Sequence, residues 1–178
     1  MKLWKRLLAI PIAASLVMGL PPAPTLAEDT THSHPICGAT HADIGDHTGD
    51  NCKDATWTAW NGTDEITYDA VTKTAYVYLE KDATRDDYLD IKAGCTLYLC
   101  LNGKKLISSS TGSTAYQWMS QVINVDNNAK FILCDCKGSG TITHSPDAKG
   151  KGVRVGGSSN AAATFSMYGG TISGNHAD

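Results

Sequence analysis

Apolar residues recur at a constant interval along this chain, and the interval strongly limits the folds that the chain can adopt. Two sets of three residues share a 34-residue step: Leu97, Phe131 and Phe165, and, two positions later, Leu99, Leu133 and Met167. Around these positions apolar residues alternate with others, which is the pattern of a short β-strand. A glycine-containing turn and one more apolar residue follow each strand, at Leu106, Ile142 and Ile172. Three passes through one strand–turn–strand pattern predict a repeating all-β structure.

A repeat of this kind predicts a solenoid, in which each turn of the chain buries its apolar side chains against neighbouring turns. The two sets of residues would then form two interior ladders, each buried side chain contributing about 1.5–3 kcal/mol. The alternative is an antiparallel sandwich of irregular hairpins. No amphipathic helix of three turns is predicted after Ala27.

Three segments also carry a resemblance to a known class of protein. These are "AGCTLYLCLNGKKL", "FILCDCKGSGTIT" and "FSMYGGTISGN". They resemble the repeats of large exported bacterial surface proteins that contain right-handed parallel β-helices of the pectin-lyase-like type, and the resemblance covers most of residues 32–175. It implies a right-handed parallel β-helix over 61–178, preceded by an irregular His/Cys/Trp-rich leader over 28–60. Such proteins are usually much longer, so we expect a short, incomplete β-helix that is truncated or associates end to end.

The N-terminal segment, 1–27, has the features of a secretory signal peptide. Lys2, Lys5 and Arg6 precede an apolar stretch, 7–20, that is short for a membrane span, and small residues end at Ala27. We expect cleavage after Ala27 and a secreted or cell-surface product; an uncleaved N-terminal anchor is the alternative. Without these three of the 15 basic residues and with all 18 acidic ones, residues 28–178 carry a net charge of −6. This charge argues against nucleic acid or an anionic membrane as a partner, and no second apolar span follows.

Six cysteines follow the expected cleavage site, and an even number in an exported protein suggests disulfide bonds. Cys100 and Cys134 share the 34-residue step and would be neighbours on adjacent strands. Side chains in register on parallel strands point the same way, which suits a disulfide poorly. We therefore expect stacked thiols at this pair, and we identify no partner for Cys95 or Cys136.

The segment "HSHPICGATHADIGDHTGDNC", residues 32–52, is a candidate zinc site. Its best tetrahedral set is Cys37, His41, His47 and Cys52, with gaps of three to five residues that match no standard zinc-finger spacing. Four protein ligands leave no coordination position for water, so such a zinc would be structural. One alternative is a Cys37–Cys52 disulfide that stabilises by about 3 kcal/mol. The other is a leader whose histidines bind nothing.

Three tryptophans are candidate ligand-binding residues: Trp57 and Trp60 in "WTAW", and Trp118 in the longest predicted loop. On an exposed face a tryptophan pair would stack on sugar rings. At the start of a solenoid such a pair more often covers the apolar end of the first turn, and we favour that role for Trp57 and Trp60.

The sequence contains no complete catalytic motif of the enzymes that share the pectin-lyase-like fold. Hydrolases of this fold pair two carboxylates with other motifs, and here only Asp86 and Asp87 form a pair, without those companions. A calcium-dependent lyase needs clustered acidic ligands and a base. We therefore expect a non-catalytic, adhesin-like module that presents a surface to a glycan or an extracellular protein. The alternative is a lyase or hydrolase that acts on an acidic polysaccharide.

Overall fold

A computed structural model describes residues 32–36, 54–110, 120–156 and 162–176. By its internal contacts the chain divides into residues 1–30 and residues 31–178, and all described residues belong to the second unit. The expected signal peptide, 1–27, lies outside the described residues. Within them no helix is long and apolar enough to cross a membrane.

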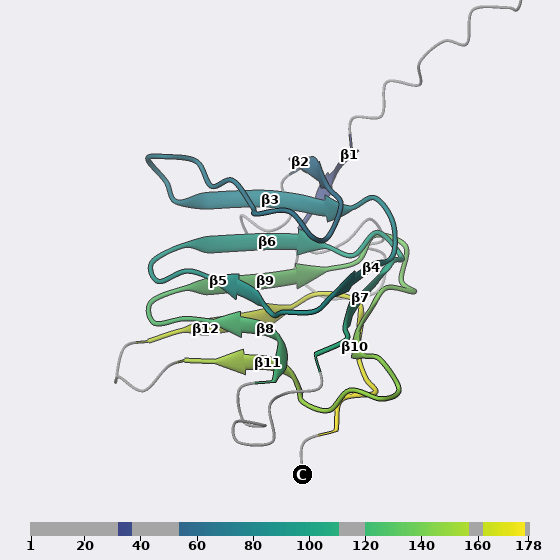
Figure 1. The fold of residues 1–178 in the computed structure, drawn as a ribbon. Helices are drawn as coiled ribbons and strands as arrows, with labels where there is room; N and C mark the ends of the chain where they lie inside the picture. Colours follow the sequence, from purple (N-terminus) through teal and green to yellow (C-terminus); the bar gives the residue numbers. More distant parts are fainter. Residues whose placement is uncertain (1–31, 37–53, 111–119, 157–161, 177–178) are drawn as a thin grey trace, which may run out of the picture. The chain divides into compact units, whose positions relative to one another are not determined.

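Every regular element in the described ranges is a β-strand (Figure 1). In chain order the strands are β1 (His32–Pro35), β2 (Asp54–Trp60), β3 (Thr74–Leu79), β4 (Ala83–Arg85), β5 (Leu89–Ile91), β6 (Thr96–Cys100), β7 (Lys105–Ser108), β8 (Gln121–Val125), β9 (Lys130–Cys134), β10 (Thr141–His144), β11 (Lys151–Val155), β12 (Thr164–Met167) and β13 (Thr171–Ile172). The predicted all-β class is therefore confirmed.

The strands form three sheets, which the chain visits in a constant order. Sheet 1 has the order β1-β2-β3-β6-β9-β12, sheet 2 the order β13-β10-β7-β4, and sheet 3 the order β11-β8-β5. We call one passage through the sheets a circuit, so that β3–β5, β6–β8 and β9–β11 are complete circuits and β12–β13 begin a fourth. All pairs are parallel except β1 with β2. This pairing excludes an antiparallel sandwich for the described strands.

The strand register confirms the two predicted ladders in sheet 1. Leu97 pairs with Phe131 and Phe131 with Phe165; the ladder that begins at Leu99 continues in the same way through Leu133 and Met167. The interval is not constant along the chain, however. Ala75 on β3 pairs with Leu97 on β6, which is a shorter step than the one from Leu97 to Phe131. The first circuit is shorter because its turns hold fewer residues.

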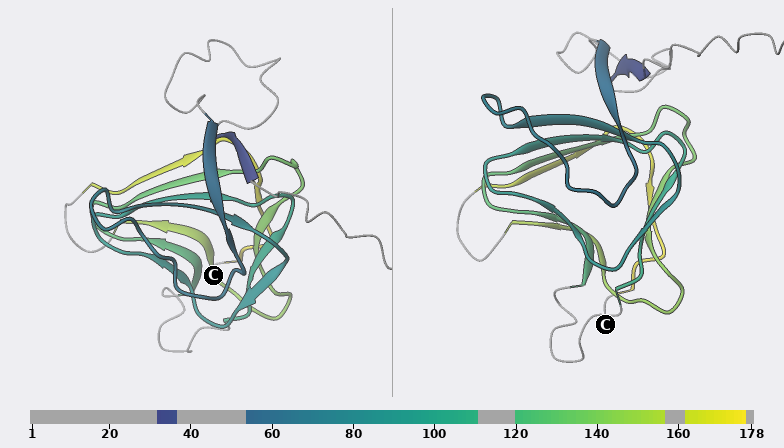
Figure 2. Two further views of the ribbon diagram at one scale, coloured as in Figure 1. Left: turned by 90° about the horizontal axis from the view of Figure 1, so that it is seen from above. Right: turned by 45° about the horizontal axis from the view of Figure 1, so that its top comes forward.

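The interior is built from one face of each sheet, and the three sheets surround it (Figure 2). Leu97, Leu99, Phe131 and Leu133 are fully buried there. The rings of Phe131 and Phe165 stack with their centroids 5.2 Å apart. Phe165 is only half-buried, since the described residues place no further strand beside β12.

A buried carboxylate joins the turns of successive circuits. Asp135 Oδ1 accepts a hydrogen bond from the Gly103 amide at 2.7 Å, and Oδ2 accepts one from the Gly140 amide at 2.6 Å. The next circuit passes close by, because a Cβ added to Gly169 would lie 3.0 Å from the Asp135 amide nitrogen. This crowding is a physical reason for glycine at that position of the "GGTIS" turn.

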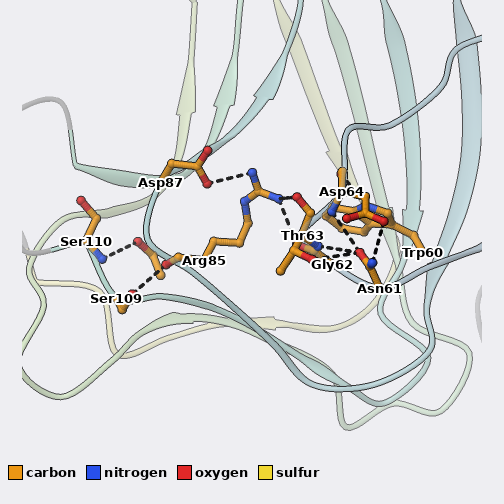
Figure 3. A network of polar contacts seen from close by, with 10 residues as sticks. Trp60, Asn61, Gly62, Thr63, Asp64, Arg85, Asp87, Ser109 and Ser110 are labelled. Carbon is orange, nitrogen blue, oxygen red and sulfur yellow. Dashed lines mark hydrogen bonds and ion pairs between the residues drawn. The ribbon is translucent and has the colours of Figure 1, made fainter.

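The segment after β2 lies against the first circuit and is held there by hydrogen bonds from Arg85. Arg85 Nη1 donates to the carbonyl oxygens of Gly62 and Thr63, each at 3.0 Å, and Nη2 pairs with Asp87 at 2.8 Å (Figure 3). Asp87 of the predicted Asp86-Asp87 pair is thus an ion-pair partner of this arginine.

Candidate metal centre

β1 and the start of β2, an antiparallel hairpin at the edge of sheet 1, pack on the face of the neighbouring strands β3, β6 and β9 that points away from the interior. Their side chains, with the thiols of sheet 1, form a second hydrophobic cluster, separate from the main core. The buried members on or beside the hairpin are Trp57 and Ile36, and those on sheet 1 are Cys100 and Cys134. The cluster therefore brings β1 next to two successive circuits.

Four possible metal ligands converge in this cluster. The Nε2 atoms of His32 and His34 are 3.0 Å apart, and the Sγ atoms of Cys100 and Cys136 are 3.6 Å apart. Cys136 Sγ lies 3.8 Å from His32 Nε2. All four ligand atoms lie within 4.8 Å of one another, so this set of side chains could hold a metal ion.

Both imidazole rings are held in place by neighbouring groups. His34 Nδ1 donates a hydrogen bond to the carbonyl oxygen of Pro35 at 2.7 Å, which leaves Nε2 with its lone pair toward the cluster. The His34 ring stacks on Trp57 with centroids 4.6 Å apart, and the His32 ring stacks on Tyr78 at 4.0 Å. These contacts fix the orientation of both rings before any ion binds.

The three thiols of the cluster differ in acidity. A hydrogen bond from Cys134 lowers the pKa of Cys100 to about 3, helped by His34 and opposed by burial of the thiol. The interaction with Cys100, and then burial, raises the pKa of Cys134. Burial, followed by the charge of Cys100, raises the pKa of Cys136 to about 12. The opposite directions of these pKa shifts favour ionisation at Cys100 over the other two thiols.

The pKa of His34 is raised for a related reason. Burial lowers its pKa, but the hydrogen bond to Cys100, the bond to Pro35 and the thiolate charge together raise it above the ordinary value. The negative charge of an anionic sulfur favours the protonated imidazole beside it. The same charge would favour a bound cation at this place.

The position of Cys136 is set by the turn that contains Asp135. Besides the two bonds already described, Asp135 Oδ1 accepts from the Lys137 amide at 3.3 Å. Cys136 Sγ lies 3.6 Å from Asn102 Oδ1, and Asn102 Nδ2 donates to the Leu79 carbonyl oxygen at 3.1 Å. Groups from three circuits thus hold this thiol toward Cys100.

This ligand set was not predicted from the sequence. The predicted set of Cys37, His41, His47 and Cys52 lies outside the described residues. The sequence identified no partner for Cys136; its sulfur is a free thiol that lies next to the Cys100 sulfur. Two signals were available: the His-x-His pattern at the start of the leader, and the position of Cys136 just beyond the repeat partner of Cys100.

The cysteines in the described ranges are free thiols, and Cys100 and Cys134 are paired in register, as expected for stacked thiols. Cys95 is half-buried against the main core. It lies apart from the four-residue cluster and is a natural control for it.

Two of the predicted ligand-binding tryptophans are in described segments, and both are buried. Trp57 is 4% exposed and packs in the second cluster, where its Nε1 donates to the His34 carbonyl oxygen at 3.2 Å. Trp60 is 5% exposed and packs in the main core. Trp118 lies outside the described residues. Stacking of sugars on these residues stays a prediction.

A hollow of about 620 Å³ lies between β2, the segment that follows it and β3. Its apolar lining includes Trp60, Ile66 and Val77. Four carboxylates, and no lysine or arginine, are among the described residues around it: Asp64, Glu65, Asp69 and Glu80.

No protein-family model matches this sequence, and comparisons with curated proteins and with solved structures give no significant match. The resemblance to exported bacterial surface proteins therefore stays a prediction.

Proposed function

We propose that this chain is an exported, non-catalytic module that presents a rigid surface to a glycan or an extracellular protein. Its scaffold is a right-handed parallel β-helix, and a structural Zn²⁺ ion bound by His32, His34, Cys100 and Cys136 fastens the N-terminal hairpin to that scaffold. The observation that carries the proposal is the convergence of these four ligand atoms from the leader and from two successive circuits.

The β-helix is supported by the order in which the chain visits the sheets. Each circuit adds one strand to each sheet, always beside the strand of the previous circuit. Leu97, Phe131 and Phe165 mark one interior ladder along the stack. Such stacking lets every circuit cover the apolar side of its neighbour, which is the basis of solenoid stability.

Zinc is supported by the distances between the ligand atoms. Tetrahedral zinc with Zn–S of about 2.3 Å and Zn–N of about 2.05 Å requires S···S of about 3.8 Å, N···N of about 3.3 Å and S···N of about 3.6 Å. The corresponding distances are 3.6 Å, 3.0 Å and, for Cys136 with His32, 3.8 Å. The first two are slightly shorter than the tetrahedral values and the third is slightly longer; the remaining pairs lie within 4.8 Å, so side-chain shifts of up to about 1 Å would complete the site.

A site of this composition is structural. Two thiolates and two imidazoles fill the tetrahedral shell of zinc and leave no position for a reacting water. Cys100 is fully buried and His34 is 6% exposed, so a substrate could not reach the ion from their side. The ion would link His32 in the leader with Cys100 and Cys136 in the repeats, which are distant from it in the sequence.

The hollow beside β2 favours a binding module over an enzyme for acidic polysaccharide. Glu65 is paired with Lys92, but the other carboxylates around the hollow, Asp64, Asp69 and Glu80, would disfavour a polymer of uronic acids because like charges repel. Its mixed lining of apolar residues such as Trp60 and polar residues such as Thr67 suits a neutral sugar or a protein surface better.

Metal analysis of purified residues 28–178 tests the zinc site. We expect about one zinc per chain, lost in Cys100→Ser and in His34→Ala, and retained in the control Cys95→Ser. The double variant Cys37→Ser/Cys52→Ser should also keep its zinc. Loss of zinc in that variant, with retention in Cys100→Ser, would instead establish the leader set predicted from the sequence.

A glycan array combined with a lyase assay on uronic-acid polymers tests the functional class. We expect binding to a subset of neutral glycans or to an extracellular protein, without formation of unsaturated products. Absorbance from unsaturated uronates would refute the non-catalytic proposal and support the lyase alternative.

A further inference from the structure

We propose that the metal centre is redox-sensitive: a low-molecular-weight disulfide oxidises Cys100 and Cys136 to a disulfide, and the zinc is released. This inference rests on the proposed zinc site and adds its regulation. The metal would then fasten the hairpin only under reducing conditions, although the chain is expected to be exported.

The separation of the two sulfurs makes the oxidation local. Cys100 Sγ and Cys136 Sγ are 3.6 Å apart, and a disulfide bond is about 2.05 Å long, so the atoms need to approach by about 1.6 Å. Cys136 belongs to a turn rather than to β9, and it is therefore not bound to the in-register geometry of paired strands. The turn can supply this movement more easily than the strand.

Access determines which sulfur reacts first. Cys136 is half-buried, whereas Cys100 and Cys134 are completely buried. A small oxidant therefore reaches Cys136 before the other two thiols of the cluster. Cys134 is the register partner of Cys100 on the adjacent parallel strand, a geometry that disfavours a bond between them.

The chemistry is a two-step thiol–disulfide exchange. Cys136, which is deprotonated while it is a zinc ligand, attacks the reagent disulfide through Sγ, forms a mixed disulfide and expels one reagent thiolate. The Cys100 thiolate then attacks Cys136 Sγ and expels the second reagent thiolate. Two cysteine sulfurs are oxidised, the reagent is reduced by two electrons, and its two thiolates take two protons from water. A disulfide offers no thiolate to zinc, so the two imidazoles that remain would bind the ion too weakly to keep it.

Release of zinc would remove the tether between β1 and the stacked circuits. β1 would still pair with β2 through His32 with Trp57 and the following residues. Its link to Cys100 and Cys136 would be gone, whereas β2 would stay paired with β3; β1 would then be held by its pairing with β2 and by stacking of His32 on Tyr78, so the β1 side of the hairpin would be less firmly held. Loosening of the hairpin is therefore the expected structural consequence.

Titration of zinc-loaded 28–178 with oxidised glutathione tests the inference, in a Cys37→Ser/Cys52→Ser background that removes the leader thiols. Released zinc is followed with a chromophoric chelator, and disulfides are mapped by mass spectrometry. We expect one zinc released for each Cys100–Cys136 disulfide, reversal by dithiothreitol with added zinc, and unchanged behaviour in the control Cys95→Ser. Exchange of the β1 amides with deuterium should rise in parallel.

The outcomes separate this inference from the proposal on which it rests. A protein that contains no zinc before oxidation refutes the zinc site and, with it, the redox coupling. A protein that binds zinc but keeps it in excess oxidised glutathione refutes the redox coupling alone. Zinc release accompanied by a Cys100–Cys134 disulfide, or by modification of Cys95 only, also refutes it.

Discussion

Replacement of Asp135 by alanine should loosen the turns that join successive circuits. Its two carboxylate oxygens accept the Gly103 and Gly140 amides at 2.7 and 2.6 Å, and the residue is only 8% exposed. Alanine leaves both amides without this acceptor. Gly140 is buried, so water cannot easily replace the lost bond, whereas Gly103 is partly exposed and water can.

The magnitude follows from these two bonds. A buried donor left unsatisfied costs about 1–3 kcal/mol, and a partly hydrated one costs less. We therefore expect Asp135→Ala to lower the free energy of unfolding by about 2–4 kcal/mol. Asp135→Asn keeps one side-chain oxygen and should lower it by about 1–3 kcal/mol, since only one of the two amides loses its acceptor.

Urea denaturation of residues 28–178 in the presence of a chelator measures the effect without a contribution from bound metal. Asp87→Ala is the matched control, because its carboxylate is 65% exposed and forms a surface ion pair worth at most about 1 kcal/mol. Hydrogen exchange at Gly103 and Gly140 should accelerate in Asp135→Ala only. A stability loss in Asp135→Ala no greater than in Asp87→Ala would refute the reasoning.

Three further predictions concern the core, a turn and the last strands. Phe131→Ala removes a fully buried ring that stacks on Phe165, and should lower the free energy of unfolding by about 3–5 kcal/mol in the same urea assay, whereas Ile132→Ala on the other face should lower it less. Gly170→Ala should destabilise more than Gly138→Ala by thermal denaturation. Both glycines have a positive φ, of 87° and 75°, but only at Gly170 would the new methyl group meet a neighbour, Leu101 Cδ1 at 2.8 Å. Met167 is 44% exposed on β12, next to half-buried Phe165, so Met167→Lys should reduce any concentration-dependent self-association seen by sedimentation velocity, and equal association of both proteins would argue against end-to-end pairing through β12.

The sheet-1 ladders could be predicted because they are a property of local pattern and spacing. Alternation around Leu97, Phe131 and Phe165 identifies strands, and equal spacing identifies neighbours, since a repeated chain length returns the chain to the same sheet. The short first circuit was not predicted. Its strand β3 carries Ala75 and Val77 at the buried positions, and the step from Ala75 to Leu97 follows no interval found elsewhere in the sequence.

The metal cluster could not be predicted, because spacing identifies only ligands that are close in sequence. His32 and His34 belong to the leader, and Cys100 and Cys136 belong to the repeats. They meet because β1 and the start of β2 pack over the outward face of the neighbouring strands of sheet 1, where Trp57 lies in the same cluster as Tyr76 and Tyr78. The local sequence pattern of the leader does not predict which face of the sheet these residues cover.

By itself, the sequence determined that this chain is all-β and that its apolar residues return to the same ladders, because alternation and spacing act along the chain. Only the tertiary structure decided which thiols and imidazoles share a site. The contacts between the leader and the second and third circuits depend on packing between segments that a long stretch of chain separates, and on the turn that Asp135 holds for Cys136. The ladders are a consequence of periodicity, whereas the metal centre is a consequence of how two dissimilar segments pack together.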